Sequence, residues 1–144
     1  MRQLFEPLLA AASGEQRQRW LAGAAGFAAP LVDPRAQPVQ DAPEASYRLV
    51  HALYWLLANL TDDQPVALLV DDLQWADEPS LRLFLFLATR VEALPIAVVI
   101  GCRPDCPPIA DLTRRPDTRV LRPGPLSRAT VARWLRASTG RDLP

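Results

Sequence analysis

Two short runs of apolar residues constrain the fold of this chain most. Val66–Val70 and Ile96–Ile100 are of strand length, contain no polar residue and are bounded by turn-forming residues. Apolar runs without polar alternation are typical of strands that are buried on both faces of a parallel sheet. The stretch between them is long enough for the helix that a right-handed parallel crossover requires. The two runs therefore predict a β–α–β unit and an α/β fold.

Helical periodicity predicts further elements around this unit. A third, shorter strand is expected at about 118–121, where Arg119, Val120 and Leu121 form an extended-looking segment. The predicted helices are Arg2–Ala12, Glu15–Phe27, Ser46–Leu60, a crossover helix that Asp77 caps and that runs to about Glu92, and Arg128–Ser138.

The composition excludes several classes of function. The chain of 144 residues carries 16 basic and 16 acidic residues, and every basic residue is an arginine. This balance removes the electrostatic argument for binding nucleic acid or a membrane surface directly. The lack of lysine excludes a complete G-x-x-x-x-G-K-[ST] phosphate loop within these residues, and also a Schiff-base lysine.

The cysteines and the histidine do not predict a metal site. Cys102, Cys106 and His51 lack the paired spacing of zinc ligands, and free thiols are favoured over a C-x-x-x-C disulfide. No apolar run approaches the roughly 20 residues that span a bilayer. We therefore expect a cytoplasmic protein that does not bind a membrane.

Two carboxylates directly follow the first apolar run. Asp71 and Asp72 would lie at the carboxyl end of the strand, where open α/β sheets bind ligands. Magnesium prefers oxygen ligands and keeps several waters, so one carboxylate together with nucleotide phosphates can complete its sphere. The second carboxylate could orient or activate a water for attack on a phosphoryl group. The alternative is an acidic turn in which Asp72 caps a local structure, and this short pattern alone leaves both interpretations open.

The wider segment around these carboxylates resembles a known family. Val66–Ser80 reads VALLVDDLQWADEPS and resembles the Walker B segment of STAND-type ATPases, above all the large ATP-binding LuxR-family transcriptional regulators with AAA-type domains. Other stretches resemble the same family in the same order: MRQLFEPLL at 1–9, HALYWLLANL within 46–60, VVIGCRP at 98–104 and LRPGPLS at 121–127.

The resemblance implies roles for three residues. Asp71 matches the magnesium ligand, and Asp72 matches the second acidic position, which positions or activates water. Arg103 matches a sensor arginine near the terminal phosphate, where a planar and permanently charged group suits phosphate recognition. A surface arginine that bonds strand carbonyls is the alternative for Arg103. The implied cofactors are Mg²⁺ and ATP.

The resemblance also implies a partial P-loop NTPase-like fold of three layers. Its parts would be N-terminal helices at 1–28, a proline-rich loop at 29–44, the Walker B and sensor portion at 45–126, and the start of a helical lid at 127–144. The family's first strand and phosphate loop would precede residue 1. A central strand would also be missing, so that the two apolar strands either flank an empty slot or pair directly.

Such a chain would carry the hydrolysis side of a nucleotide site without its phosphate-binding side. We expect weak or no ATP binding by the chain alone, and enzymatic activity stays open. One alternative is a non-enzymatic interaction module that associates with itself or with the rest of a parent protein. Another alternative is a gene fragment without an independent role.

Several other residues are interpreted as structural. We expect Trp75 to be a packing anchor and Asp77 to be a helix cap rather than a metal ligand. His51, Trp55 and Asn59 fall on one stripe of their helix, which indicates a half-exposed face. The aromatic residues expected in the core are Trp20, Phe84, Phe86 and Trp134.

Overall fold

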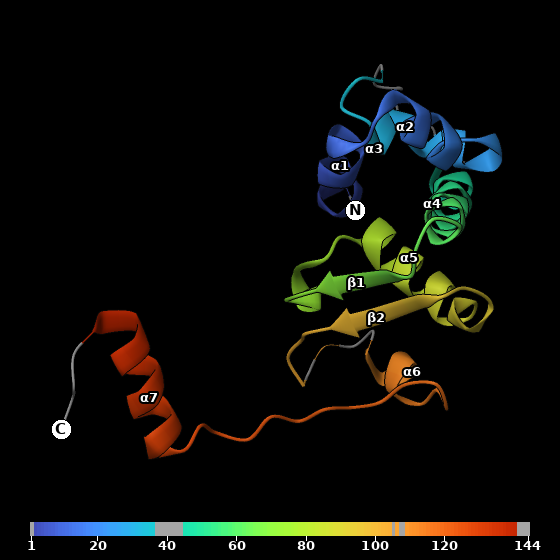
Figure 1. Cartoon of the computed structure of the whole chain (residues 1–144). Helices are drawn as coiled ribbons and strands as arrows, with labels where there is room; N and C mark the ends of the chain where they lie inside the picture. The colour runs from blue at the N-terminus through green and yellow to red at the C-terminus, as the bar shows by residue number, and fades with distance from the viewer. Residues whose placement is uncertain (1, 37–44, 105, 107–108, 141–144) are drawn as a thin grey trace. The chain divides into compact units, whose positions relative to one another are not determined.

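The computed structural model describes residues 2–36, 45–104, 106 and 109–140, and it divides into two compact units, Met1–Leu112 and Thr113–Pro144 (Figure 1). The elements are α1 (Arg2–Ala11), α2 (Gly14–Trp20), the 3₁₀-helix η1 (Gly23–Ala28), α3 (Ala29–Val32), α4 (Ala45–Thr61), β1 (Val66–Val70), the 3₁₀-helix η2 (Leu73–Trp75), α5 (Glu78–Ala88), the 3₁₀-helix η3 (Val91–Ala93), β2 (Ile96–Ile100), α6 (Ile109–Thr113) and α7 (Arg128–Thr139).

The predicted β–α–β unit is confirmed. Strands β1 and β2 pair in parallel, in a register that runs from Val66 opposite Ile96 to Val70 opposite Ile100. Helix α5 lies between them in the sequence, as a parallel crossover requires. Of the two arrangements considered for these strands, the structure has the direct pairing, which makes a two-stranded sheet among the described residues.

The two faces of this sheet differ in burial. Leu68 is buried, and Val66 and Val70, two positions away on the same face of the strand, pack against the core. On the opposite face, Leu69 is 69 % exposed and Val99 is 56 % exposed, and these two residues are directly paired. An apolar face of the sheet is therefore left in contact with solvent.

The strand predicted at 118–121 is wrong. Among the described residues, 118–127 have no regular secondary structure, and Val120 and Leu121 are exposed. A strand is stabilised by hydrogen bonds to a neighbour in a ladder, and among the described residues the ladder consists of β1 and β2. The β-branched and apolar residues of 118–121 are not enough to form a strand without such a neighbour.

Helix α4 contributes more buried residues to the described core than any other element. Leu53, Leu56 and Leu57 are fully buried, and the helix contacts η1, α2, α5 and β1. Its apolar residues therefore hold the N-terminal helices on one side and the β–α–β unit on the other. Within the described residues, no helix is both long and apolar enough to cross a bilayer.

The predicted helix at Glu15–Phe27 is interrupted. Helix α2 ends at Trp20, and Gly23 then adopts a positive φ of 62°, which glycine accepts without strain. The side chain of Asn59 on α4 donates a hydrogen bond of 2.9 Å to the Trp20 carbonyl at this helix end. Asn59 thus satisfies a carbonyl that the helix leaves without an internal partner.

The proline-rich segment 29–44 is only partly described. Ala29–Val32 forms the short helix α3, with Pro30 in its first turn, where proline is tolerated. Residues 37–44 lie outside the described part, so the predicted loop there is not tested.

Of the four aromatic residues predicted to lie in the core, two are buried. Trp20 and Phe84 are buried. Phe86 is partly buried, with the His51 ring edge-on at 4.8 Å between centroids. Trp134 is exposed, and α7 has no buried residue.

Candidate functional site

The site is built where β1 and β2 end side by side. Beyond the two strands, the Gly101 N–H donates to the Val70 carbonyl at 2.7 Å, and the Leu73 N–H donates to the Gly101 carbonyl at 3.0 Å. These bonds continue the pairing past the last strand residues. They hold the chain on either side of Asp71 and Asp72 against the end of β2.

A tight turn sets the two carboxylates. Asp72 has a left-handed backbone with φ of 54°, a conformation that aspartate tolerates better than most residues. Its N–H donates to Asp71 Oδ1 at 2.9 Å, and both side chains are exposed. Leu73, only 1 % exposed, anchors the following 3₁₀-helix η2 in the core. Asp72 precedes η2 but makes no side-chain capping bond to it in the described structure.

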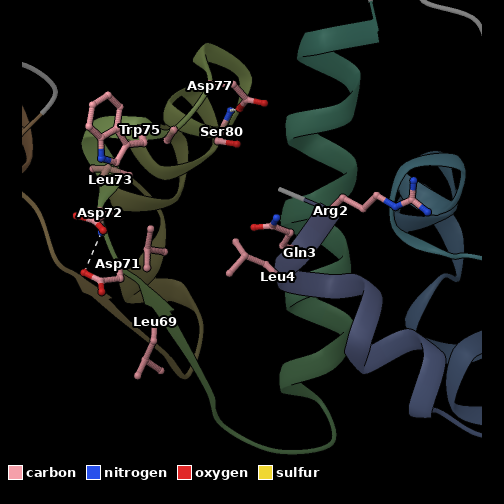
Figure 2. Close-up of a pocket in the computed structure, with 12 residues that line it drawn as sticks. Arg2, Gln3, Leu4, Leu69, Asp71, Asp72, Leu73, Trp75, Asp77 and Ser80 are labelled. Carbon is pink, nitrogen blue, oxygen red and sulfur yellow. Dashed lines mark hydrogen bonds between the residues drawn. The ribbon is translucent and has the colours of Figure 1, made fainter.

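A cavity of about 590 Å³ opens beside these carboxylates. Figure 2 shows Asp71, Asp72 and Trp75 on one side of it and Gln3 and Leu4 of α1 on the other. The site thus joins the end of β1 to the first helix of the chain.

The Arg2 side chain also contributes to this cavity's lining, yet it extends away from the carboxylates (Figure 2). Its Nε forms an ion pair of 2.8 Å with Glu6. The guanidinium is therefore engaged on its own helix rather than with Asp71 or Asp72.

The cap prediction for Asp77 is confirmed. Asp77 Oδ1 accepts the Ser80 N–H at 2.8 Å at the start of α5. Hydrogen bonds from the Ser80 side chain and backbone lower the pKa of the Asp77 carboxyl below its ordinary value. Asp77 lines the cavity but is committed to the helix end.

Trp75 differs from its predicted role as a packing anchor. It is 75 % exposed, and Leu73 is the buried residue of η2. The Arg103 guanidinium lies 5.8 Å from the centre of the Trp75 ring. The structure therefore brings Arg103 next to η2, although the described residues that line the cavity do not include it.

Sequence reasoning missed Gln74 and Gly101. Gln74 Nε2 donates to Asp72 Oδ1 at 2.6 Å, and Gln74 Oε1 accepts the Arg103 N–H at 3.2 Å. A Cβ at Gly101 would lie 2.7 Å from Asp71 Oδ1, so this position must be glycine if the carboxylate is to stay in place. Gln74 lies within the quoted DDLQWAD segment, but its long-range partner gives no local signal.

The two thiols and the histidine lie outside the cavity lining. Cys102 and Cys106 are free, and burial together with the nearby Cys106 raises the pKa of the Cys102 thiol. The His51 ring lies 4.6 Å from Tyr47 and 4.8 Å from Phe86. These contacts fit the partly exposed helix face that was predicted for His51.

The carboxylates fit a hard cation that brings some of its own ligands. Among the described residues, no three His, Cys, Asp or Glu side chains are grouped so that they could hold a metal. Asp71 and Asp72 offer oxygen donors at an open cavity, which suits Mg²⁺, because this ion keeps several waters and phosphate oxygens in its sphere. A transition-metal site of nitrogen and sulfur ligands does not fit this donor set.

The comparisons with known proteins give one match. The family model described as AAA ATPase domain matches residues 1–100, which extend from α1 to the end of β2 and include Asp71 and Asp72. Gly101 and Arg103 lie just beyond the matched residues. Neither the curated proteins nor the solved structures gave a match.

The contact of Gly101 with Asp71 predicts the effect of Gly101→Ala. The added methyl group should displace the exposed Asp71 carboxylate, so that the Asp72 N–H loses its acceptor. We expect hydrogen exchange of the Asp72 amide, measured by NMR, to rise about tenfold. The free energy of unfolding should change by less than about 1 kcal/mol, because an exposed side chain can turn aside.

Gly124→Ala is the matched control, since a Cβ there meets no atom within 4 Å. It should leave exchange of the Asp72 amide unchanged. If Gly101→Ala also leaves this amide unchanged, Gly101 does not set the Asp71 carboxylate.

Proposed function

The chain belongs to the AAA ATPase domain family, and we propose that Asp71, Asp72 and the end of β2 form the cation-binding and hydrolysis side of its nucleotide site. One observation carries this proposal. Two exposed carboxylates stand at the carboxyl end of a parallel strand and line a cavity of about 590 Å³. That edge of an α/β sheet is where ligands bind.

Each residue has a separate role in this proposal. Asp71 would hold Mg²⁺ through its carboxylate, and Asp72 would orient a water and accept its proton. Arg103 would reach the terminal phosphate from the end of β2, next to Trp75. The bound cation would supply neutralisation of the charge that develops on the phosphate oxygens.

The phosphate-binding side of the site is weak in this chain. The 144 residues contain no lysine. The first turn of α5, which could offer N–H groups to an anion, is capped by Asp77, and Arg2 is paired with Glu6. Backbone N–H groups and a lysine supply much of the phosphate affinity in P-loop sites. We therefore infer that the chain alone binds Mg·ATP weakly, with a dissociation constant above the micromolar range.

The finer family assignment rests on the sequence around the site. The DDLQWAD segment at Asp71–Asp77 supports placing the chain among STAND-type domains of LuxR-family transcriptional regulators. In such a protein, ATP would act as a switch ligand, and DNA binding would belong to another domain.

Terbium luminescence tests the cation site. Tb³⁺ takes oxygen ligands like other hard cations, and Trp75 lines the same cavity and can sensitise its emission. We expect saturable emission that excess Mg²⁺ displaces. Asp71→Asn should weaken Tb³⁺ binding by about tenfold or more, because it neutralises a ligand.

Two variants make this measurement specific. Asp62→Asn changes an exposed carboxylate in the turn between α4 and β1, at the other end of the strand, and should leave binding unchanged. Trp75→Phe should remove the emission and keep the affinity as measured by calorimetry. Equal weakening by Asp62→Asn and Asp71→Asn would refute a site at Asp71.

The exposed apolar face of the sheet favours a second candidate function. The paired residues Leu69 and Val99 are largely exposed, and apolar surface of this kind favours association with a protein partner or a second copy. Sedimentation velocity discriminates this candidate. Self-association that Leu69→Ser reduces would support it, and a monomer at high concentration would count against self-association.

A further inference from the structure

We propose that Gln74 is a positioning residue that couples the Asp72 carboxylate to the backbone of Arg103, so that the ends of β1 and β2 respond to a bound cation together. The cation part of this inference rests on the proposed function. The coupling itself is a property of the chain without any ligand.

The two ends of one side-chain amide make this connection. Gln74 Nε2 donates to Asp72 Oδ1 at 2.6 Å, and Gln74 Oε1 accepts the Arg103 N–H at 3.2 Å. An ionised carboxylate only accepts, and a backbone N–H only donates. The two partners therefore determine which way the amide is oriented, and a flipped amide would lose both bonds.

Asp72 needs such a contact to be held in place. Its backbone is left-handed, and its carboxylate is exposed and does not cap η2. The bond from Gln74 is charge-assisted, which makes it stronger than a bond between neutral groups. Leu73 is buried beside Gln74 in the same 3₁₀-helix, so the backbone that carries Gln74 is anchored in the core.

The far end of the connection is the residue proposed to meet the phosphate. Arg103 lies 29 positions from Gln74 in the sequence, and its guanidinium is 5.8 Å from the ring of Trp75, the neighbour of Gln74. Gln74 therefore joins the residue proposed to orient water to the residue proposed to contact the terminal phosphate.

Gly101 and Gln74 each affect the position of one carboxylate at this edge of the sheet. Gly101 leaves the space that the Asp71 carboxylate occupies, and Gln74 holds the Asp72 carboxylate. Both connect the β1 end to the three residues that follow β2. A cation that binds to the carboxylate of Asp71 or Asp72 will therefore change the environment of the Arg103 amide.

NMR on the full chain tests the coupling in two steps. In the absence of ligand, Gln74→Leu should raise hydrogen exchange of the Arg103 amide by about tenfold, because the acceptor is lost. Gln74→Glu cannot donate to Asp72 and would place a second carboxylate against it, so this variant should not restore slow exchange. Gln64→Leu, at an exposed position in the turn before β1, should have no effect.

The second step is a titration with Mg²⁺ alone. In the wild type, the amides of Asp71, Asp72 and Arg103 should shift with the same saturation curve. In Gln74→Leu, the shifts at Asp71 and Asp72 should persist and the shift at Arg103 should be reduced at least about threefold.

The outcomes separate this inference from the proposed function. Unchanged exchange at Arg103 in Gln74→Leu, or an undiminished Mg²⁺ shift there, overturns the coupling. A wild type whose Asp71 and Asp72 amides do not respond to Mg²⁺ overturns the proposed cation site, and the exchange measurement then decides the Gln74 connection by itself.

Discussion

The parallel pairing of β1 and β2 is the interaction on which the candidate site depends. Because the strands run in the same direction, their carboxyl ends lie at one edge of the sheet, and residues far apart in sequence become neighbours there. The two hydrogen bonds of Gly101 extend this pairing to the turn that carries the carboxylates. The burial of α4 against β1 and α5 keeps this unit together with the N-terminal helices, of which α1 supplies the other side of the cavity.

The site is asymmetric in its chemistry. Oxygen donors gather at the end of β1, which suits a hard cation, whereas the positive groups nearby are already engaged or lie beyond the cavity lining. A site for a nucleotide and its Mg²⁺ needs both kinds of group, oxygen donors for the cation and N–H or positive groups for the phosphates. The proposed function assigns to this chain the part of that site that its own residues can perform, which is to hold a cation and a water.

The sequence alone predicted those features that depend on residues close together in the chain. The apolar runs predicted both strands, and the residue type and position of Asp77 predicted its cap. Predictions failed where the outcome depends on distant residues. Residues 118–121, expected as a strand, are not part of the ladder that the described residues form, and Trp75 is exposed because Leu73 fills the core position in η2. The contacts of Gln74 could not be predicted, since one of its two partners lies 29 positions away.

The most direct test of the central claim is to locate a divalent cation in crystals of this chain. Crystals soaked in Mn²⁺, which shares the preference of Mg²⁺ for oxygen ligands, would be measured for anomalous scattering. The account predicts a peak at coordination distance from the Asp71 carboxylate, within the cavity that α1 and η2 also line. Peaks found only at other carboxylates, such as Asp62 and Asp63 at the opposite end of β1, would contradict it.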